Sequence, residues 1–194
     1  MKLLVQASVI CTALLSVTQI YAENITITGE VFDTTCALSG AEGTDNAYKD
    51  ISVALASVSS KALGKAGDVT GLKPFTMKLT QDDASTACAM GGESANDKFA
   101  NITLSSGTVE AGNTLVNTAE GAPATPEEGR VDVQVLTDTD QVVDFTNPAA
   151  QAHSTVSKEG DFPTVTYKAQ YIRTGADAIY QKVQTQMTYQ INYN

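Results

Sequence analysis

The chain has 194 residues and a formal net charge of −10, with 12 Lys and Arg residues against 22 Asp and Glu residues. An acidic excess of this size argues against nucleic acid and anionic membranes as partners, because clustered Lys and Arg residues bind both. The length fits a single domain with a sizeable core.

Residues 1–22 have the pattern of a secretory signal peptide. Lys2 precedes an apolar run over residues 3–17, which is too short for a comfortable membrane span and gives way to polar residues. We expect cleavage after Ala22, so that the mature chain is residues 23–194 and has no direct membrane insertion. Export also implies an oxidising compartment.

Short alternating segments dominate the mature chain. In each of them every second residue is apolar or β-branched, the period of a half-buried strand, and Gly, Ser, Asn, Asp and Pro residues separate them. The expected strands cover residues 24–32, 51–58, 73–80, 99–106, 130–137, 141–145, 163–172 and 181–194. This pattern predicts an all-β fold, an antiparallel β-sandwich in one domain.

The last expected strand, QKVQTQMTYQINYN over residues 181–194, keeps its alternation to the penultimate residue. Met187, Tyr189, Ile191 and Tyr193 fall on one face of it. Terminal residues usually fray unless something ties them down. We therefore expect a partner that pairs with this strand and covers its apolar side.

Two cysteines, Cys36 and Cys88, remain in the mature chain, because Cys11 leaves with the signal peptide. In an oxidising compartment we expect them to form a disulfide, and the alternative is a pair of free buried thiols. The bridge would close a loop of about 50 residues, worth about 4 kcal/mol in the chain-entropy model.

The sequence offers little material for a reaction centre. His153 is the only histidine, so a zinc site with two histidines is excluded, and a Ser-His-Asp site has no GxSxG motif to support it. Acidic pairs fit surface turns better than the spacing of a calcium loop. These pairs are Asp82 with Asp83, Glu127 with Glu128, and Asp138 with Asp140. We expect no enzyme, no cofactor and no metal.

Several motifs, in order, resemble pilins of the chaperone-usher class, the family of type 1 fimbrial structural subunits. ITITGEVFDTTCAL is similar to the family's segment leading to its first half-cystine, and KPFTMKLTQDD to the strand before the second. RVDVQVLTDTDQVVDF resembles the central hairpin, and PTVTYKAQYIRTGADA the strand that follows. Tyr193 matches the penultimate Tyr of the family's C-terminal strand. Near the start of that strand, where the family tends to have Gly, this chain has Gln181.

The resemblance implies an incomplete immunoglobulin-like β-sandwich, the pilin fold, which lacks its last strand and is completed by a donor strand. Residues 181–194 would then be a C-terminal strand beside an open groove. Its face would bind first a periplasmic chaperone and then a neighbouring subunit. The binding residues implied are those of the apolar face: Met187, Tyr189, Ile191 and Tyr193.

The resemblance also implies a donor segment at the N-terminus of the mature chain. Residues 23–30 would be the N-terminal donor-strand extension, with Ile25 and Ile27 pointing into the groove of the neighbour. Gly29 would fit a narrow position there.

The implied function is that of a structural subunit of a fimbria, or pilus, which polymerises by donor-strand exchange at an outer-membrane usher and supports cell adhesion. The chain would be exported through the periplasm to the cell surface. One alternative is a self-contained secreted β-sandwich that binds a glycan or other ligand. Its candidate lining residues are Tyr48, Tyr167, Tyr171 and Tyr180. A third hypothesis is a hydrolase that uses scattered acidic residues.

Overall fold

The computed structural model describes residues 36–88, 99–110 and 113–193, without the side chains of Phe99, Ala100, Glu159 and Tyr193. The expected signal peptide over residues 1–22, the expected donor extension over residues 23–30 and the strand expected over residues 24–32 lie outside the described residues. Their predictions are therefore not tested by this structure.

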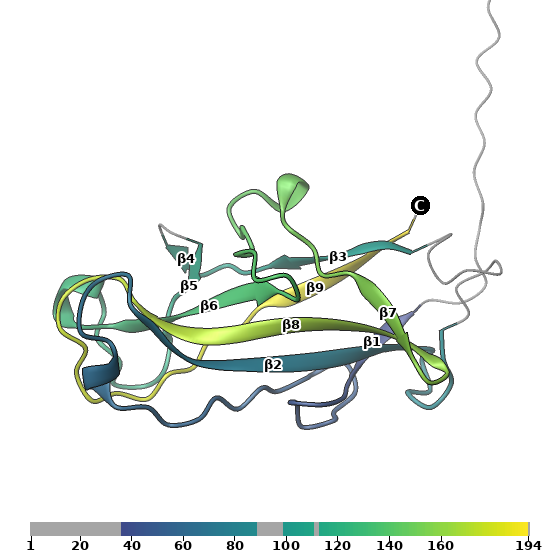
Figure 1. Cartoon of the computed structure of the whole chain (residues 1–194), viewed down its shortest axis with the longest axis horizontal. Coiled ribbons are helices and arrows are strands. Elements are labelled where there is room, and N and C mark those ends of the chain that lie inside the picture. The colour runs from purple at the N-terminus through teal and green to yellow at the C-terminus, as the bar shows by residue number, and fades with distance from the viewer. Residues whose placement is uncertain (1–35, 89–98, 111–112, 194) are drawn as a thin grey trace, which may run out of the picture. The chain divides into compact units, whose positions relative to one another are not determined.

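The described part of the chain is built from β-strands with three short 3-10 helices between them (Figure 1). The strands are β1 (Ala37–Gly40), β2 (Val69–Thr80), β3 (Phe99–Ser105), β4 (Val109–Glu110), β5 (Thr114–Leu115), β6 (Val131–Thr137), β7 (Val156–Glu159), β8 (Phe162–Arg173) and β9 (Thr188–Tyr193). The 3-10 helices are η1 (Ser60–Ala62), η2 (Pro126–Glu128) and η3 (Pro148–Ala150). The predicted all-β class is confirmed.

The strands form two sheets. The larger has the order β1-β2-β8-β6-β5-β4, with β7 also paired to β8, and the smaller consists of β3 and β9. All of these pairings are antiparallel. The long strand β8 is central, because β2 runs along one of its edges while β7 and then β6 pair with the other.

The hydrophobic core lies between the two sheets, because both turn alternate apolar side chains inward. Leu38, Phe75 and Tyr167 of the larger sheet and Ile102 and Leu104 of β3 all have exposures of 2% or less. A fully buried side chain of this size contributes about 1.5–3 kcal/mol. The sandwich layering that the alternation predicted is therefore present.

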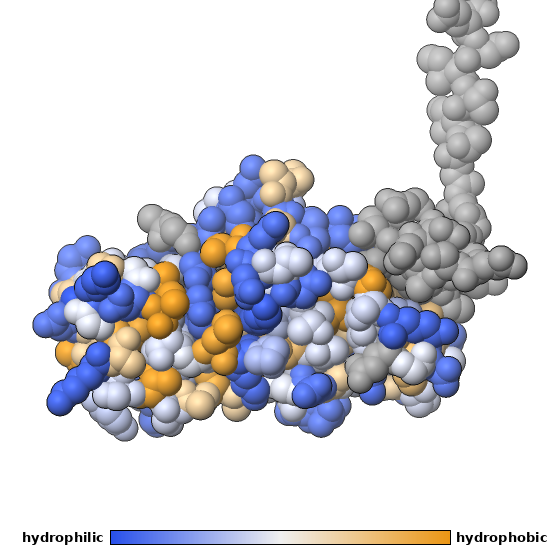
Figure 2. Space-filling model, viewed as in Figure 1, coloured by the Kyte–Doolittle hydropathy of each residue, from blue (hydrophilic) through white to orange (hydrophobic). Residues whose placement is uncertain are grey.

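The outer surface in Figure 2 is mainly polar, with apolar side chains in separate patches. The large apolar residues that are exposed include Val69, Leu72 and Ile179. Scattered exposed residues of this kind are normal for a folded domain. The face in Figure 2 is thus a polar surface with scattered apolar side chains.

Two expected strands do not pair as strands within the described residues. Residues 51–58 are extended but belong to no ladder. Residues 141–145 form only an isolated bridge between Leu136 and Val142. The prediction of a strand at 141–145 is wrong, because its alternation instead reflects Val143 and Phe145, which fill the core from a loop.

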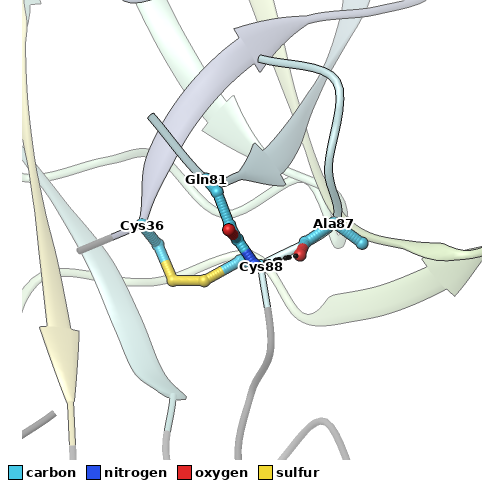
Figure 3. The surroundings of a disulfide bond; sticks show 4 residues. All are labelled: Cys36, Gln81, Ala87 and Cys88. Atoms are coloured by element: carbon cyan, nitrogen blue, oxygen red, sulfur yellow. Dashed lines mark hydrogen bonds between the residues drawn. A yellow bond between two sulfur atoms is a disulfide. The ribbon is translucent and has the colours of Figure 1, made fainter. Parts of the chain in front are cut away.

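Cys36 and Cys88 form the predicted disulfide, with their Cα atoms 5.6 Å apart (Figure 3). Cys36 immediately precedes β1, and the Cys88 N–H donates to the Leu79 C=O of β2 at 3.1 Å. Between β2 and Cys88, the Gln81 side chain donates to the Ala87 C=O at 3.4 Å. The bridge therefore joins the start of β1 to the segment that folds back against the end of β2.

Replacing both cysteines, as Cys36→Ser with Cys88→Ser, is expected to lower the free energy of unfolding by about 4 kcal/mol, because the unfolded chain loses its closed loop. The bridge spans a sequence separation of 52 residues. Urea unfolding of the variant, and of the wild type with and without reductant, measures the change. An unfolding midpoint that neither the variant nor the reductant shifts would contradict this prediction.

Candidate functional site

A groove of about 940 Å³ lies between two extended segments of the chain. Residues 49–55 form one wall, and residues 183–189, which lead into β9, form the other. The floor is apolar and comes from both sheets. It consists of Phe75, Met77, Leu104, Leu115, Val133, Val135, Ala169 and Tyr171. The groove therefore opens directly onto the hydrophobic core.

The first wall has the side-chain pattern of a strand without the hydrogen bonds of one. Ile51, Val53 and Leu55 are partly buried against the core, and the residues between them are exposed. Among the described residues, no backbone–backbone hydrogen bond reaches residues 53–58. The predicted half-buried alternation is thus present at 51–55, but residues 56–58 are exposed and the prediction of a strand over 51–58 is wrong.

The second wall is hydrogen bonded on one side. The Gln184 C=O accepts from the Thr118 N–H at 2.8 Å, and the Gln184 N–H donates to the side-chain oxygen of Asn117 at 3.0 Å. The Gln186 C=O accepts from the Ser106 hydroxyl at 2.9 Å. The even-numbered residues of this wall therefore face Ser106, which follows β3, and residues 117–118, which follow β5.

The backbone groups of Val183, Thr185 and Met187 point the other way, because successive residues of an extended chain direct their N–H and C=O groups to opposite sides. None of these groups is hydrogen bonded to another described residue. The hydroxyl of Thr185 is also buried without a partner in the described part of the chain. The wall therefore offers a strand edge to the groove.

Tyr189 spans the two sheets at one end of the groove. Its side chain lines the groove, and its hydroxyl accepts a hydrogen bond from the Leu38 N–H of β1 at 3.4 Å. This contact joins β9 of the smaller sheet to the edge strand of the larger one. Because the Leu38 C=O also accepts from the Lys49 N–H at 3.0 Å, both walls are connected to Leu38 at this end.

A buried polar cluster holds the chain at the other end, and we call it the polar anchor. It consists of Asn117, Arg130, Asp132 and Gln181. The Asn117 amide donates to the Lys182 C=O at 2.8 Å and to the Gln181 side-chain oxygen at 3.0 Å. The start of the second wall is therefore fixed by side chains rather than by a neighbouring strand.

Gln181 connects the polar anchor to the chain around the start of β6. Its side-chain oxygen accepts from the Val131 N–H at 3.0 Å, and its amide donates to the Gly129 C=O at 2.8 Å. Gly129 has φ of 88° and lies so close to the Asp177 backbone that a Cβ atom would collide with it. Residues 129–131 and Gln181 thus pack tightly against each other.

The ion pair of the polar anchor is almost fully buried. The side chains of Arg130 and Asp132 are 2% and 0% exposed, and Arg130 Nε donates to Asp132 Oδ1 at 2.8 Å. Burial opposes the charged guanidinium, but its hydrogen bonds to Asp132 and Glu110 outweigh burial and raise the pKa of Arg130. The Asn117 N–H donates to Asp132 at 2.9 Å, so the pair also positions Asn117.

Sequence similarity identifies the family. No family model matches the chain. The F17 fimbrial protein of Escherichia coli is 30% identical over 172 residues, which cover 86% of this chain and 85% of that protein. The chain belongs to the chaperone-usher fimbrial subunit family. It is therefore a pilin, a structural protein and not an enzyme.

Two solved pilus structures share the fold of this pilin. One, from a study of the uncoiling of a chaperone-usher pilus rod, has a TM-score of 0.52 at 17% identity and covers 89% of this chain and 96% of its own. The other, the P pilus rod subunit PapA, has a TM-score of 0.50 at 16% identity and covers 82% and 99%. At these identities the likeness concerns the fold alone.

The structure brings together part of the residue set predicted for the pilin's C-terminal strand. Met187 and Tyr189 line the groove, and Ile191 is partly buried against the same core. The side chain of Tyr193 lies outside the described residues. So do the predicted donor residues Ile25, Ile27 and Gly29.

Sequence reasoning missed two parts of this site. Residues 49–55 were not expected to form the first wall, although the alternation from Ile51 to Leu55 was the available signal. Asn117 was not singled out, because an Asn in a polar segment is also typical of an ordinary turn. Gln181 was noted only as a departure from the family's Gly, whereas its side chain is part of the polar anchor.

The four tyrosines of the alternative ligand site are not gathered on one surface. Tyr167 is fully buried, and burial raises the pKa of its hydroxyl to about 12. Tyr171 lies in the floor of the groove, whereas Tyr180 is 94% exposed. The hydroxyl of Tyr48 donates to Asp82 at 3.0 Å. The arrangement does not support a sugar site built from these four side chains.

Other functional chemistry finds little support in the described residues. Within residues 36–88, 99–110 and 113–193, no group of three His, Cys, Asp or Glu side chains is placed to hold a metal ion. The same part of the chain contains no helix long and apolar enough to cross a membrane. His153 is hydrogen bonded through Nδ1 to the Ile102 C=O at 3.0 Å.

The substitution Asn117→Ala is expected to lower the free energy of unfolding by about 2–4 kcal/mol, because several buried hydrogen bonds are lost at about 1 kcal/mol each. It should also speed amide exchange at Gln184, whose N–H loses its acceptor. Urea unfolding and hydrogen exchange measure the two effects. Asn147→Ala is the matched control, since Asn147 is exposed and its side chain has no capping bond, and an equal effect there would contradict the prediction.

Proposed function

We propose that this pilin polymerises by donor-strand exchange, with the N-terminal extension of one subunit serving as the missing strand in the groove of the next. The observation that carries the proposal is the set of backbone groups of Val183, Thr185 and Met187, which face an apolar groove without a partner among the described residues. A strand laid along this edge would pair with them and cover the core.

The proposed donor strand, residues 23–30, has a composition that fits this groove. Ile25 and Ile27 alternate with polar residues, so both side chains would point to the apolar floor while the backbone pairs with the wall. Each Ile that becomes fully buried contributes about 1.5–3 kcal/mol. Gly29 follows at the same period and would occupy a position too narrow for a side chain.

The groove also explains why such a subunit needs a chaperone before assembly. An apolar groove beside an unpaired strand edge promotes aggregation. A periplasmic chaperone would add its own strand along the face that carries Met187, Tyr189, Ile191 and Tyr193. At the outer-membrane usher, the extension of the next subunit would then replace the chaperone strand.

The proposed exchange accounts for a filament. Each subunit donates one strand and accepts one, and such head-to-tail contacts produce an open polymer when they do not close into a ring. The filament would leave through the usher and extend from the cell surface, where it would support adhesion. Membership of the fimbrial subunit family supports this proposed route.

The substitution Met187→Glu is expected to weaken chaperone binding by about a hundredfold or more, because it places a charge in the apolar groove. Gln186→Glu is the matched control, since it introduces the same charge at the exposed neighbouring position. Co-purification with the chaperone and titration of the purified components measure the difference. Equal binding by the two variants would count against the groove as the binding site.

Deletion of residues 23–28 is expected to abolish polymerisation and to leave chaperone binding intact, because the variant lacks its donor strand but keeps its groove. Electron microscopy of surface fibres and size-exclusion chromatography of the chaperone complex measure the two properties. Fibres assembled by the deletion variant would contradict the proposed donor. Expression of the wild-type mature chain without a chaperone that yields a soluble monomer instead of aggregate would contradict the proposed function as a whole. The urea measurements described above use chain that is refolded at high dilution, where aggregation is slow.

A further inference from the structure

The smaller sheet has a second edge, on the side of β3 that faces away from β9. Asn101, Thr103 and Ser105 of β3 are paired with residues of β9. The backbone groups of the alternate residues, Ile102 and Leu104, point to the opposite side. This outer edge is a second place where an incoming strand could pair, unless something occupies it.

The side chain of Gln151 occupies this edge and imitates a strand. Its Oε1 accepts from the Leu104 N–H at 2.8 Å, and its Nε2 donates to the Leu104 C=O at 2.8 Å and to the Asp144 C=O at 3.0 Å. One side-chain amide therefore makes both hydrogen bonds that a residue of a neighbouring strand would make. Gln151 is 4% exposed, so the pair is shielded from water.

Neighbouring groups extend the contact along β3. His153 Nδ1 donates to the Ile102 C=O at 3.0 Å, and the Tyr167 hydroxyl donates to the same oxygen at 3.3 Å. Ser154, which is 5% exposed, accepts from the Asp138 N–H at 3.0 Å and so ties this loop to the end of β6. Figure 1 shows the loop between β6 and β7, with its short helix η3, rising from the sandwich beside β3.

We propose that Gln151, supported by His153, is an edge cap that occupies the outer edge of β3 and confines strand addition to the groove. This inference rests on the proposed function, because it concerns which of two edges accepts a strand. A subunit with one donor strand and one accepting edge forms an unbranched filament. A second accepting edge would allow branching and lateral aggregation.

The cap is tested by Gln151→Leu in the complex of the pilin with its periplasmic chaperone, where the groove is filled. The matched control is Gln170→Leu. Gln170 is also buried, at 8% exposure, and its amide bonds to the Gln134 side chain at 2.8 Å. It pairs with Gln134 of β6 and lies in β8, an inner strand that has β2 on its other side. The control thus removes a buried amide without freeing a strand edge.

The expected result is an acceleration of amide exchange at Leu104 by about tenfold or more in Gln151→Leu, the factor equivalent to about 1.4 kcal/mol. The Gln151→Leu complex should also self-associate in light scattering, while the wild-type and Gln170→Leu complexes keep one subunit per chaperone. Unchanged exchange at Leu104, or equal association of the two variants, would overturn the cap.

Gln151→Glu keeps the cap testable if the leucine variant does not fold. Its carboxylate still accepts from Leu104 N–H but presents an oxygen to two carbonyl groups. Acidification converts that oxygen to a donor, so association should reverse at low pH, and association independent of pH would overturn the proposal.

If the wild type forms no chaperone complex, the proposed function fails, and Leu104 exchange and self-association of the free chain still decide the cap.

Discussion

A strand edge that is hydrogen bonded on one side only is the constraint on which the rest of this pilin depends. The chain pairs the even-numbered residues before β9 with its own backbone and side chains, and it leaves Val183, Thr185 and Met187 directed at the groove. The edge is useful only if it stays straight without its partner. The polar anchor at one end and Tyr189 at the other hold it in that conformation.

The energetics of this arrangement differ from those of a closed sandwich. A buried ion pair such as Arg130 with Asp132 is weak evidence for stability, because desolvation of the two charges offsets much of their attraction. Its geometry, in contrast, fixes Asn117 and through it the start of the second wall. The anchor thus specifies the position of a segment that no neighbouring strand holds, while the disulfide and the apolar core supply stability.

The sequence predicted the features that depend on local periodicity or on counting. Alternation located β2, β3, β6, β8 and β9, and the presence of two cysteines after the expected signal peptide predicted the disulfide between them. The same alternation failed at residues 141–145, since Val143 and Phe145 reach the core from a loop with the spacing of a strand. Local pattern reports which side chains are buried but not which backbone pairs with which.

The sequence could not predict which side-chain amides take the place of a neighbouring strand, because their partners are distant in the sequence. Asn117 and Gln151 each satisfy backbone groups of residues far away in the sequence. Their roles depend on three-dimensional placement, and a polar residue in a loop gives no local sign of it. Asn117 holds the segment before β9, whose free edge faces the groove, and Gln151 occupies the outer edge of β3.

The position of the disulfide also determines how mechanical load would travel through the subunit. Cys36 immediately precedes β1, and its bond to Cys88 closes a covalent loop that contains every residue between them. Tension applied to the chain before Cys36 crosses the sulfur atoms directly to Cys88 and bypasses that loop. The first wall, residues 49–55, lies inside the loop. In a fibre that is pulled from its ends, the backbone of residues 49–55 would therefore not carry the tension.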